Sequence, residues 1–110
     1  MTLGGVQPFS VALTPDDDGN VVVALQGEID LATADQVWAA MVEGLTAWTG
    51  QVVVDFSAVS FLDSQGIAAL LKVHHDCDFD PARLTIRAPQ PQARKVLELT
   101  GLDQILRIED

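Results

Sequence analysis

The chain has 110 residues, a length typical of one domain with a single hydrophobic core. Its net charge of −10, from 16 acidic and 6 basic side chains, would repel nucleic acid and anionic membrane surfaces, so we exclude nucleic acid and direct membrane contact as partners. The 48% hydrophobic content excludes a disordered chain.

Alternation of apolar and small polar residues predicts a strand over Phe9–Leu13. The turn Thr14–Asn20 is short, so a second strand, Val21–Ile29, should lie antiparallel to the first. Thr33 and Gln36 have capping-box spacing, which predicts a helix that starts at Thr33. Apolar residues then recur at helical spacing up to Gly50: Ala34, Val37, Trp38, Met41, Leu45 and Trp48.

The second half of the chain alternates strands with helices. The β-branched run QVVVDF, residues 51–56, predicts a strand buried on both faces. A helical stripe follows Ser64, and strands are expected over Ala82–Ala88 and Gln104–Ile108, with a helix over Pro91–Gly101 between them. The order β-β-α-β-α-β-α-β indicates an α/β domain: a mixed sheet of about five strands, the first pair antiparallel and the rest parallel, packed with three to four helices.

The sequence also favours the cytoplasm. Cys77 is the only cysteine, so no disulfide can form within the chain, as is usual in a reducing compartment. The first residues, MTLGGVQPFS, lack the basic start and apolar centre of a signal peptide, and no apolar run could span a bilayer. We expect a cytoplasmic protein, one domain over residues 1–110, with a flexible segment over residues 1–8.

Ser64 stands beyond the end of the 51–56 strand, where sheets of this kind place their sites. Its hydroxyl could cap the following helix, and the same helix N-terminus would tolerate a phosphate on that hydroxyl. A catalytic nucleophile is excluded, because LDSQG lacks the first glycine of G-x-S-x-G. In addition, His74 would lie roughly 15 Å away along the helix. From the spacing alone, cap and phosphorylation site are both open.

Two carboxylates near Ser64 are candidates for chemistry. Asp55 ends the predicted strand, as the phosphoacceptor of a receiver domain does, but the acidic pair and the lysine of such a domain are missing. We therefore interpret Asp55 as a structural carboxylate that accepts loop N–H groups. A small enzyme that uses Asp55 or Asp63 would need a second catalytic residue, and the sequence offers none.

No metal or cofactor is predicted. HHDCDFD, residues 74–80, contains metal-ligand residue types, but only His74 and Asp78 would share a helix face. DDDGN, residues 16–20, fails the spacing of a calcium loop, and no glycine motif for a nucleotide is present.

Three stretches together resemble the STAS-domain proteins, specifically the bacterial anti-sigma factor antagonists. LQGEIDLATADQVW, residues 25–38, is similar to the strand-turn-helix with G-E-[LI]-D that opens the family's fold. VVVDFSAVSFLDSQG, residues 52–66, resembles the signature of the family: a hydrophobic strand, Asp, a short apolar loop and D-S-x-G. VLELTGLDQILRI, residues 96–108, resembles its closing helix and strand. The similarity runs from Phe9 to Ile108.

The resemblance implies that Ser64 is phosphorylated by a partner that is both anti-sigma factor and serine-protein kinase, and that a PP2C-type phosphatase reverses this. The unmodified protein, itself no enzyme, would bind that partner and release a sigma factor. The alternative is a STAS subunit of an ABC-type lipid transporter, or a stress-signalling scaffold, without a phosphorylation switch. A weak homodimer also remains open. The implied partner-binding residues are Asp30, Leu31, Thr33, Ser57, Ser60, Phe61, Leu62, Asp63, Ser64, Gln65 and Gly66.

Overall fold

The computed structural model of the protein describes residues 8–76 and 80–110. Five strands form one sheet in the order β1-β2-β3-β4-β5. Only β1 and β2 are antiparallel, and the other neighbouring pairs are parallel, which confirms the predicted α/β class and element order. The elements are β1 Ser10–Pro15, β2 Val21–Ile29, α1 Ala34–Ala47, β3 Val52–Leu62, α2 Ser64–Asp76, β4 Leu84–Arg87, α3 Pro91–Leu99 and β5 Arg107–Glu109, with 3₁₀ turns at Pro81–Arg83 and Leu102–Gln104.

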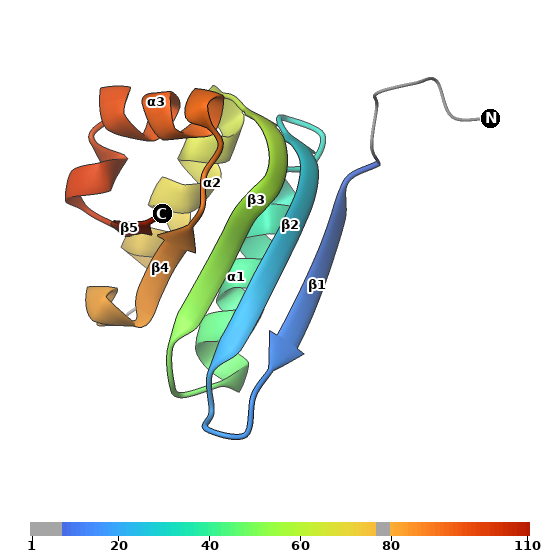
Figure 1. Ribbon diagram of the computed structural model, residues 1–110, viewed down its shortest axis with the longest axis vertical. Helices are drawn as coiled ribbons and strands as arrows, with labels where there is room; N and C mark the ends of the chain where they lie inside the picture. The colour runs from blue at the N-terminus through green and yellow to red at the C-terminus, as the bar shows by residue number, and fades with distance from the viewer. Residues whose placement is uncertain (1–7, 77–79) are drawn as a thin grey trace.

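Helices α1 and α2 pack side by side behind β2 and β3, and α3 lies beyond the carboxyl end of β4 (Figure 1). The residues of β2 alternate between the two faces of the sheet. Val21, Val23 and Leu25 are buried on the helix side, where burial stabilises the fold by about 1.5–3 kcal/mol for each side chain of this size. No helix among the described residues is both long and apolar enough to cross a bilayer.

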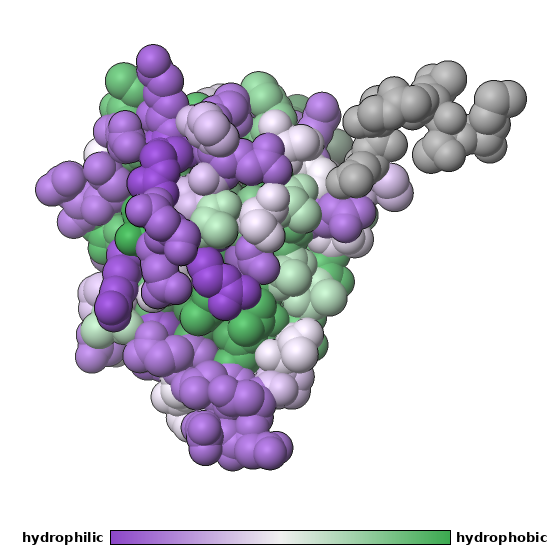
Figure 2. All heavy atoms as spheres, viewed as in Figure 1, coloured by the Kyte–Doolittle hydropathy of each residue, from purple (hydrophilic) through white to green (hydrophobic). Residues whose placement is uncertain are grey.

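The other face of the sheet carries no α1 or α2 and faces the viewer in Figures 1 and 2. Val22 and Val53 pair in register, and both are only half buried. Figure 2 shows apolar side chains at the lower centre of this face, with polar groups around them. The expectation that residues 51–56 are buried on both faces is therefore wrong, because Val53 and Asp55 on this half-covered face are only half buried.

Strand β3 is longer than predicted, because Ser57–Leu62, expected as a loop, continue the strand instead of leaving it at residue 56. The pairing with β2 contains two bulges. Ala24 and Gln26 face Asp55 and Ala58, so β3 has one extra residue there, and a second extra residue lies between the partners of Gly27 and Glu28. Bulges leave residues unpaired and bend the strand, so the sequence loses its alternation while the backbone stays extended.

Two further boundaries differ from the prediction. The expected strand Ala82–Ala88 begins only at Leu84, because Asp80 accepts the Ala82 N–H and holds Pro81–Arg83 in a 3₁₀ turn. The expected strand Gln104–Ile108 is instead a 3₁₀ turn followed by Arg107–Glu109. The predictions on residues 1–7, Cys77 and Asp78 lie outside the described residues.

Candidate functional site

Asp63 caps helix α2. Its Oδ1 accepts the backbone N–H of Gln65 at 2.8 Å and that of Gly66 at 3.2 Å, two groups that have no partner inside the helix. The predicted cap, Ser64, is therefore wrong by one residue: Ser64 is already the first residue of the helix, past the position from which a side chain can cap it.

The side chain of Ser64 is exposed. Within the part of the chain that the structure describes, its hydroxyl makes no hydrogen bond. The N–H groups at the helix start are bound by Asp63 instead. Ser64 is thus an accessible hydroxyl at a helix N-terminus, and its chemistry is not used by the fold. This arrangement favours a modification site over a cap.

The turn Asp30–Thr33 lies beside this helix start. The Asp63 N–H donates to the Ile29 carbonyl at 3.1 Å, which ties the end of β3 to the end of β2. The Asp30 carboxylate accepts the Ala32 N–H at 3.0 Å, and the Thr33 hydroxyl donates to the Glu28 carbonyl at 2.9 Å. The two segments implied as one binding surface are therefore neighbours in space.

Thr33 is the N-cap residue of α1, as predicted, but the side-chain hydrogen bond of a capping box does not form. Helix α1 begins directly after Thr33. The Thr33 hydroxyl accepts the Asp30 N–H at 3.0 Å instead, so it closes the turn on itself. Asp30 and Thr33 are both half buried, and their main effect is on the shape of the turn.

Two exposed apolar side chains lie in the segments that meet at this helix start. Leu31 is 76% exposed in the turn, and Phe61 is 41% exposed near the end of β3. Ser57, Ser60 and Gln65 are exposed as well. Large apolar groups with this much accessible area beside a polar site are typical of protein-binding surfaces.

Leu62 and Gly66, also expected to bind a partner, do not present side chains at this surface. Leu62 is completely buried, and Gly66 is buried against it. A Cβ on Gly66 would lie 2.4 Å from Leu62 Cδ1 and 2.7 Å from Ile29 Cγ2, closer than real carbon atoms approach. Both residues instead set the position of the helix start on the sheet.

Asp55 lies inside β3 and not at its end, which corrects the expected position. Its carboxylate accepts the Ser57 N–H at 2.9 Å and pairs with Arg87 on β4 at 3.1 Å. Burial alone would raise the pKa of Asp55, but the hydrogen bonds from Ser57 and the Arg87 guanidinium outweigh it and hold the pKa below 3.8. Asp55 is thus a structural carboxylate, as interpreted from the sequence.

Gln90 and Gln92, which the sequence analysis did not single out, bind the same segment from the start of α3. The Gln92 side chain accepts the Leu62 N–H and donates to the Leu62 carbonyl, each at 2.9 Å. Gln90 donates to the Ser57 carbonyl at 2.8 Å. No local signal marks these contacts, because they join positions about thirty residues apart.

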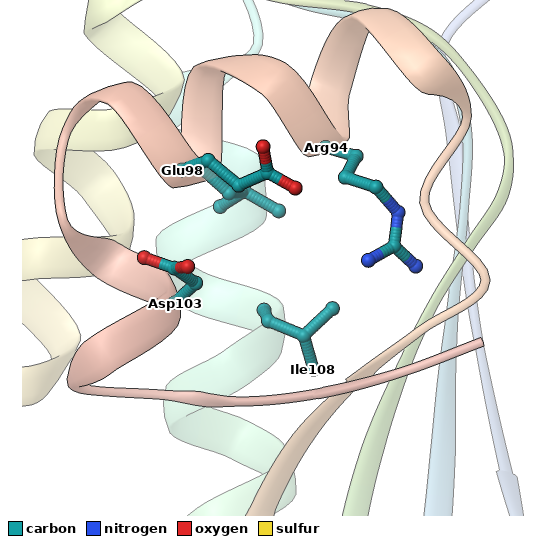
Figure 3. Close-up of a pocket in the computed structure, with 5 residues that line it drawn as sticks. Arg94, Glu98, Asp103 and Ile108 are labelled. Atoms are coloured by element: carbon teal, nitrogen blue, oxygen red, sulfur yellow. The ribbon is translucent and has the colours of Figure 1, made fainter.

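Away from Ser64, a cavity of about 210 Å³ lies between α3 and the chain end, lined by Arg94, Leu97, Glu98, Asp103 and Ile108 (Figure 3). It is smaller than the usual pocket for a small-molecule ligand. No group of three His, Cys, Asp or Glu side chains gathers anywhere in residues 8–76 and 80–110.

Comparison with known proteins adds relatives of this fold. A family model described as "Mlab, STAS domain" matches residues 13–108. The anti-sigma-F factor antagonist RsfB of Mycobacterium tuberculosis is 31% identical over 102 residues, which cover 92% of this chain and 83% of RsfB. A crystal structure of an anti-sigma factor antagonist from Mycobacterium paratuberculosis superposes with a TM-score of 0.80 at 28% identity, covering 93% of this chain and 86% of that one. The phosphorylated form of SpoIIAA, a Bacillus cell fate determinant, has the same fold, with a TM-score of 0.64 at 24% identity and coverage of 90% of each chain.

Proposed function

Because this chain belongs to the STAS-domain family, we propose that it is a cytoplasmic anti-sigma factor antagonist that is switched by phosphorylation of Ser64. The unphosphorylated form binds an anti-sigma factor, which is also a serine kinase, and a sigma factor is released. Phosphorylated Ser64 ends this binding, and a PP2C-type phosphatase restores it. RsfB and the Mycobacterium paratuberculosis structure, both named anti-sigma factor antagonists, support the proposal.

The observation that carries the proposal is the division of roles between Asp63 and Ser64. Asp63 satisfies the helix N-terminus, so the exposed Ser64 hydroxyl can be esterified without the loss of any hydrogen bond that holds the described fold. The helix start also tolerates a phosphate, because its N–H groups carry partial positive charge. The modification therefore changes the surface and leaves the fold in place.

The surface supplies both binding and its control. Leu31 and Phe61 provide apolar contact area for a partner. A phosphate on Ser64 adds about −1.5 to −2 charges next to Asp63 in the chain, at the same end of the sheet as these two side chains. Burying such a group without a matching cation costs at least about 2–3 kcal/mol, which weakens a complex about 30- to 150-fold.

The first test uses native lysate of the source organism. Incubated with ATP, it should add one phosphate to the wild-type chain and none to Ser64→Ala, as measured by intact mass and site mapping. As pull-down baits, the wild type and Ser64→Ala should capture the same anti-sigma factor kinase. Ser64→Asp should capture it at least about tenfold less well, a difference of about 1.4 kcal/mol.

A matched control separates local charge from net charge. Thr49→Asp adds the same charge in the exposed segment before β3, at the opposite end of that strand. Thr49→Asp should bind as the wild type does. Equal capture by wild type and Ser64→Asp, or phosphorylation at another residue, would overturn the proposal.

A second candidate function needs no phosphorylation. The exposed apolar pair Leu31 and Phe61 would serve equally well as a permanent docking surface. In that case the domain would be a STAS subunit of an ABC-type lipid transporter, or a stress-signalling scaffold. Recovery of one permease, ATPase or scaffold by both the wild-type and Ser64→Asp baits would select this candidate.

A further inference from the structure

The segment of β3 that leads to Ser64 has a strand on only one side. Strand β4 pairs with β3 only over residues 52–55, whereas β2 follows β3 as far as Leu62. Among residues 8–76 and 80–110, no strand pairs with the backbone groups on the β4 side of residues 57–62. Such groups exchange with solvent and fray unless another part of the protein binds them.

Side-chain amides from α3 replace the missing strand. Gln92 Oε1 accepts the Leu62 N–H and Gln92 Nε2 donates to the Leu62 carbonyl, both at 2.9 Å. One amide thus exchanges two hydrogen bonds with one residue, as the residues of a hydrogen-bonded pair in a sheet do. Gln90 Nε2 holds the Ser57 carbonyl at 2.8 Å, so the two amides bind the two ends of the segment.

The conformationally restricted turn between β4 and α3 sets the position of these amides. Ala88 has a left-handed backbone with φ of 54°, which is unusual for a residue with a Cβ, and its N–H donates to the Glu109 carbonyl at 2.7 Å. Pro89 follows and is buried, and Pro91 starts α3 with its φ already suited to a helix. Gln92 therefore stands on the first turn of a fixed helix and not on a free loop.

We propose that Gln92 is a positioning residue for Ser64, and this inference rests on the proposed function. By fixing both backbone groups of Leu62, two residues before Ser64, Gln92 holds the end of β3 in the geometry that the kinase recognises. The fold does not depend on it, because the buried Leu62 side chain and the bond from Asp63 N–H to the Ile29 carbonyl remain.

The test compares Gln92→Met, Gln92→Glu and the control Gln104→Met. Methionine keeps the length of the side chain and removes both hydrogen bonds. Gln104 is also exposed, and its amide donates to the neighbouring Asp103 at 3.5 Å, a local contact away from β3. The first readout is amide hydrogen exchange by NMR, which needs no partner. Gln92→Met should speed exchange at the Leu62 N–H at least about tenfold, and leave Val52–Val54 unchanged.

The second readout is the initial rate of Ser64 phosphorylation in source lysate with ATP. Gln92→Met should lower it about tenfold or more, since a small displacement of a reacting group has effects of this size. Gln104→Met should keep the wild-type rate. Melting temperatures of all variants show whether the fold is intact.

The Gln92→Glu variant should recover protection of the Leu62 N–H at low pH, a recovery that a general structural role of Gln92 would not predict. An ionised carboxylate repels the Leu62 carbonyl, but a protonated one donates to it and still accepts the Leu62 N–H. The ratio of the Leu62 exchange rate in Gln92→Glu to that in the wild type at the same pH should therefore fall towards one as the pH falls through the carboxyl pKa. Gln92→Met should show no such recovery.

The outcomes separate the two proposals. Faster Leu62 exchange with slower phosphorylation, both confined to the Gln92 variants, supports the positioning role. Unchanged exchange, or faster exchange with a wild-type phosphorylation rate, overturns that role and leaves the proposed function standing. Absence of phosphorylation in the wild type overturns the proposed function, and the positioning role with it.

Discussion

The Asp63 carboxylate accepts a hydrogen bond from the Gly66 backbone N–H at 3.2 Å. Asp63 thus caps the same helix turn that Gly66, because it has no side chain, allows to pack closely on the sheet. Asp63 binds the free N–H groups at the start of α2, and the absence of a Cβ on Gly66 lets the helix lie close to Leu62 and Ile29. Together they place Ser64 at the surface without using its hydroxyl.

The Asp63 cap should have a measurable effect on stability. Asp63→Ala should lower the free energy of unfolding by about 1 kcal/mol, because two helix N–H groups lose their partner, and Asp63→Asn should lose less. Urea unfolding at pH 7 measures this. Asp17→Ala is the control, since it removes the same charge from an exposed turn. Equal losses for Asp63→Ala and Asp17→Ala would show that the cap is not stabilising.

Gly66→Ala should destabilise the fold through crowding. The new Cβ would overlap Leu62 and Ile29, and overpacking of this kind costs about 1–3 kcal/mol. In a Leu62→Ala background one of the two obstacles is gone, so Gly66→Ala should cost less there. A double-mutant cycle of unfolding free energies measures the coupling. Additive effects would place the loss outside this contact.

The Asp55–Arg87 pair should make stability depend on pH. The pKa of Asp55 is held below 3.8 in the folded state, so the unfolded chain binds the proton more tightly. The stabilisation is complete above about pH 4 and is lost as the pH falls through the lowered pKa.

Arg87→Met should remove part of this contribution. Both side chains are partly exposed, at 36% and 22%, so the loss at pH 7 should be at most about 1 kcal/mol. Urea unfolding at pH 7, 4 and 3 should show a smaller acid-induced loss in Arg87→Met than in the wild type. If the two proteins lose stability in parallel on acidification, then Arg87 does not contribute to the lowered pKa.

Arg83 binds the carboxyl end of α1, whose last turn has no basic residue of its own. Its guanidinium donates to the Gly50 carbonyl at 2.9 Å and the Trp48 carbonyl at 2.8 Å, with longer bonds to Leu45. Arg83→Met should cost about 1.5–3 kcal/mol, and Arg83→Lys an intermediate amount, because lysine lacks the planar fork. Unfolding monitored by tryptophan fluorescence tests this, with Arg107→Met on the exposed edge of the sheet as the control.

The sequence predicts the element order well because most elements have a clear local pattern and turns separate them. The apolar residues of α1 recur at helix spacing, and β2 begins with an uninterrupted apolar run, Val21–Leu25. In β3 the buried residues are 52, 54, 56, 59 and 62, so the spacing changes from two to three at each bulge. The β-branched run that predicts the strand ends at residue 56, six residues before the strand does, and no regular spacing marks the rest of it.

The candidate site could be predicted only in part. Ser64 and the turn at Asp30 stand out in the chain, but which of Asp63 and Ser64 caps the helix depends on a one-residue difference in where the helix begins. The contact of Gln92 with Leu62 depends on where β4 stops pairing and where α3 starts. Local patterns contain neither piece of information.

The two bulges of β3 together determine which face of the sheet the side chains after them meet. One extra residue reverses which face of the sheet every later side chain meets, and a second restores the original sense. Leu62 therefore returns to the core face only because the extra residues come as a pair. Across evolution, an insertion or deletion of two residues within 57–61 should be tolerated, whereas a change of one residue should be rare. The fold therefore constrains the number of residues between Asp55 and Ser64.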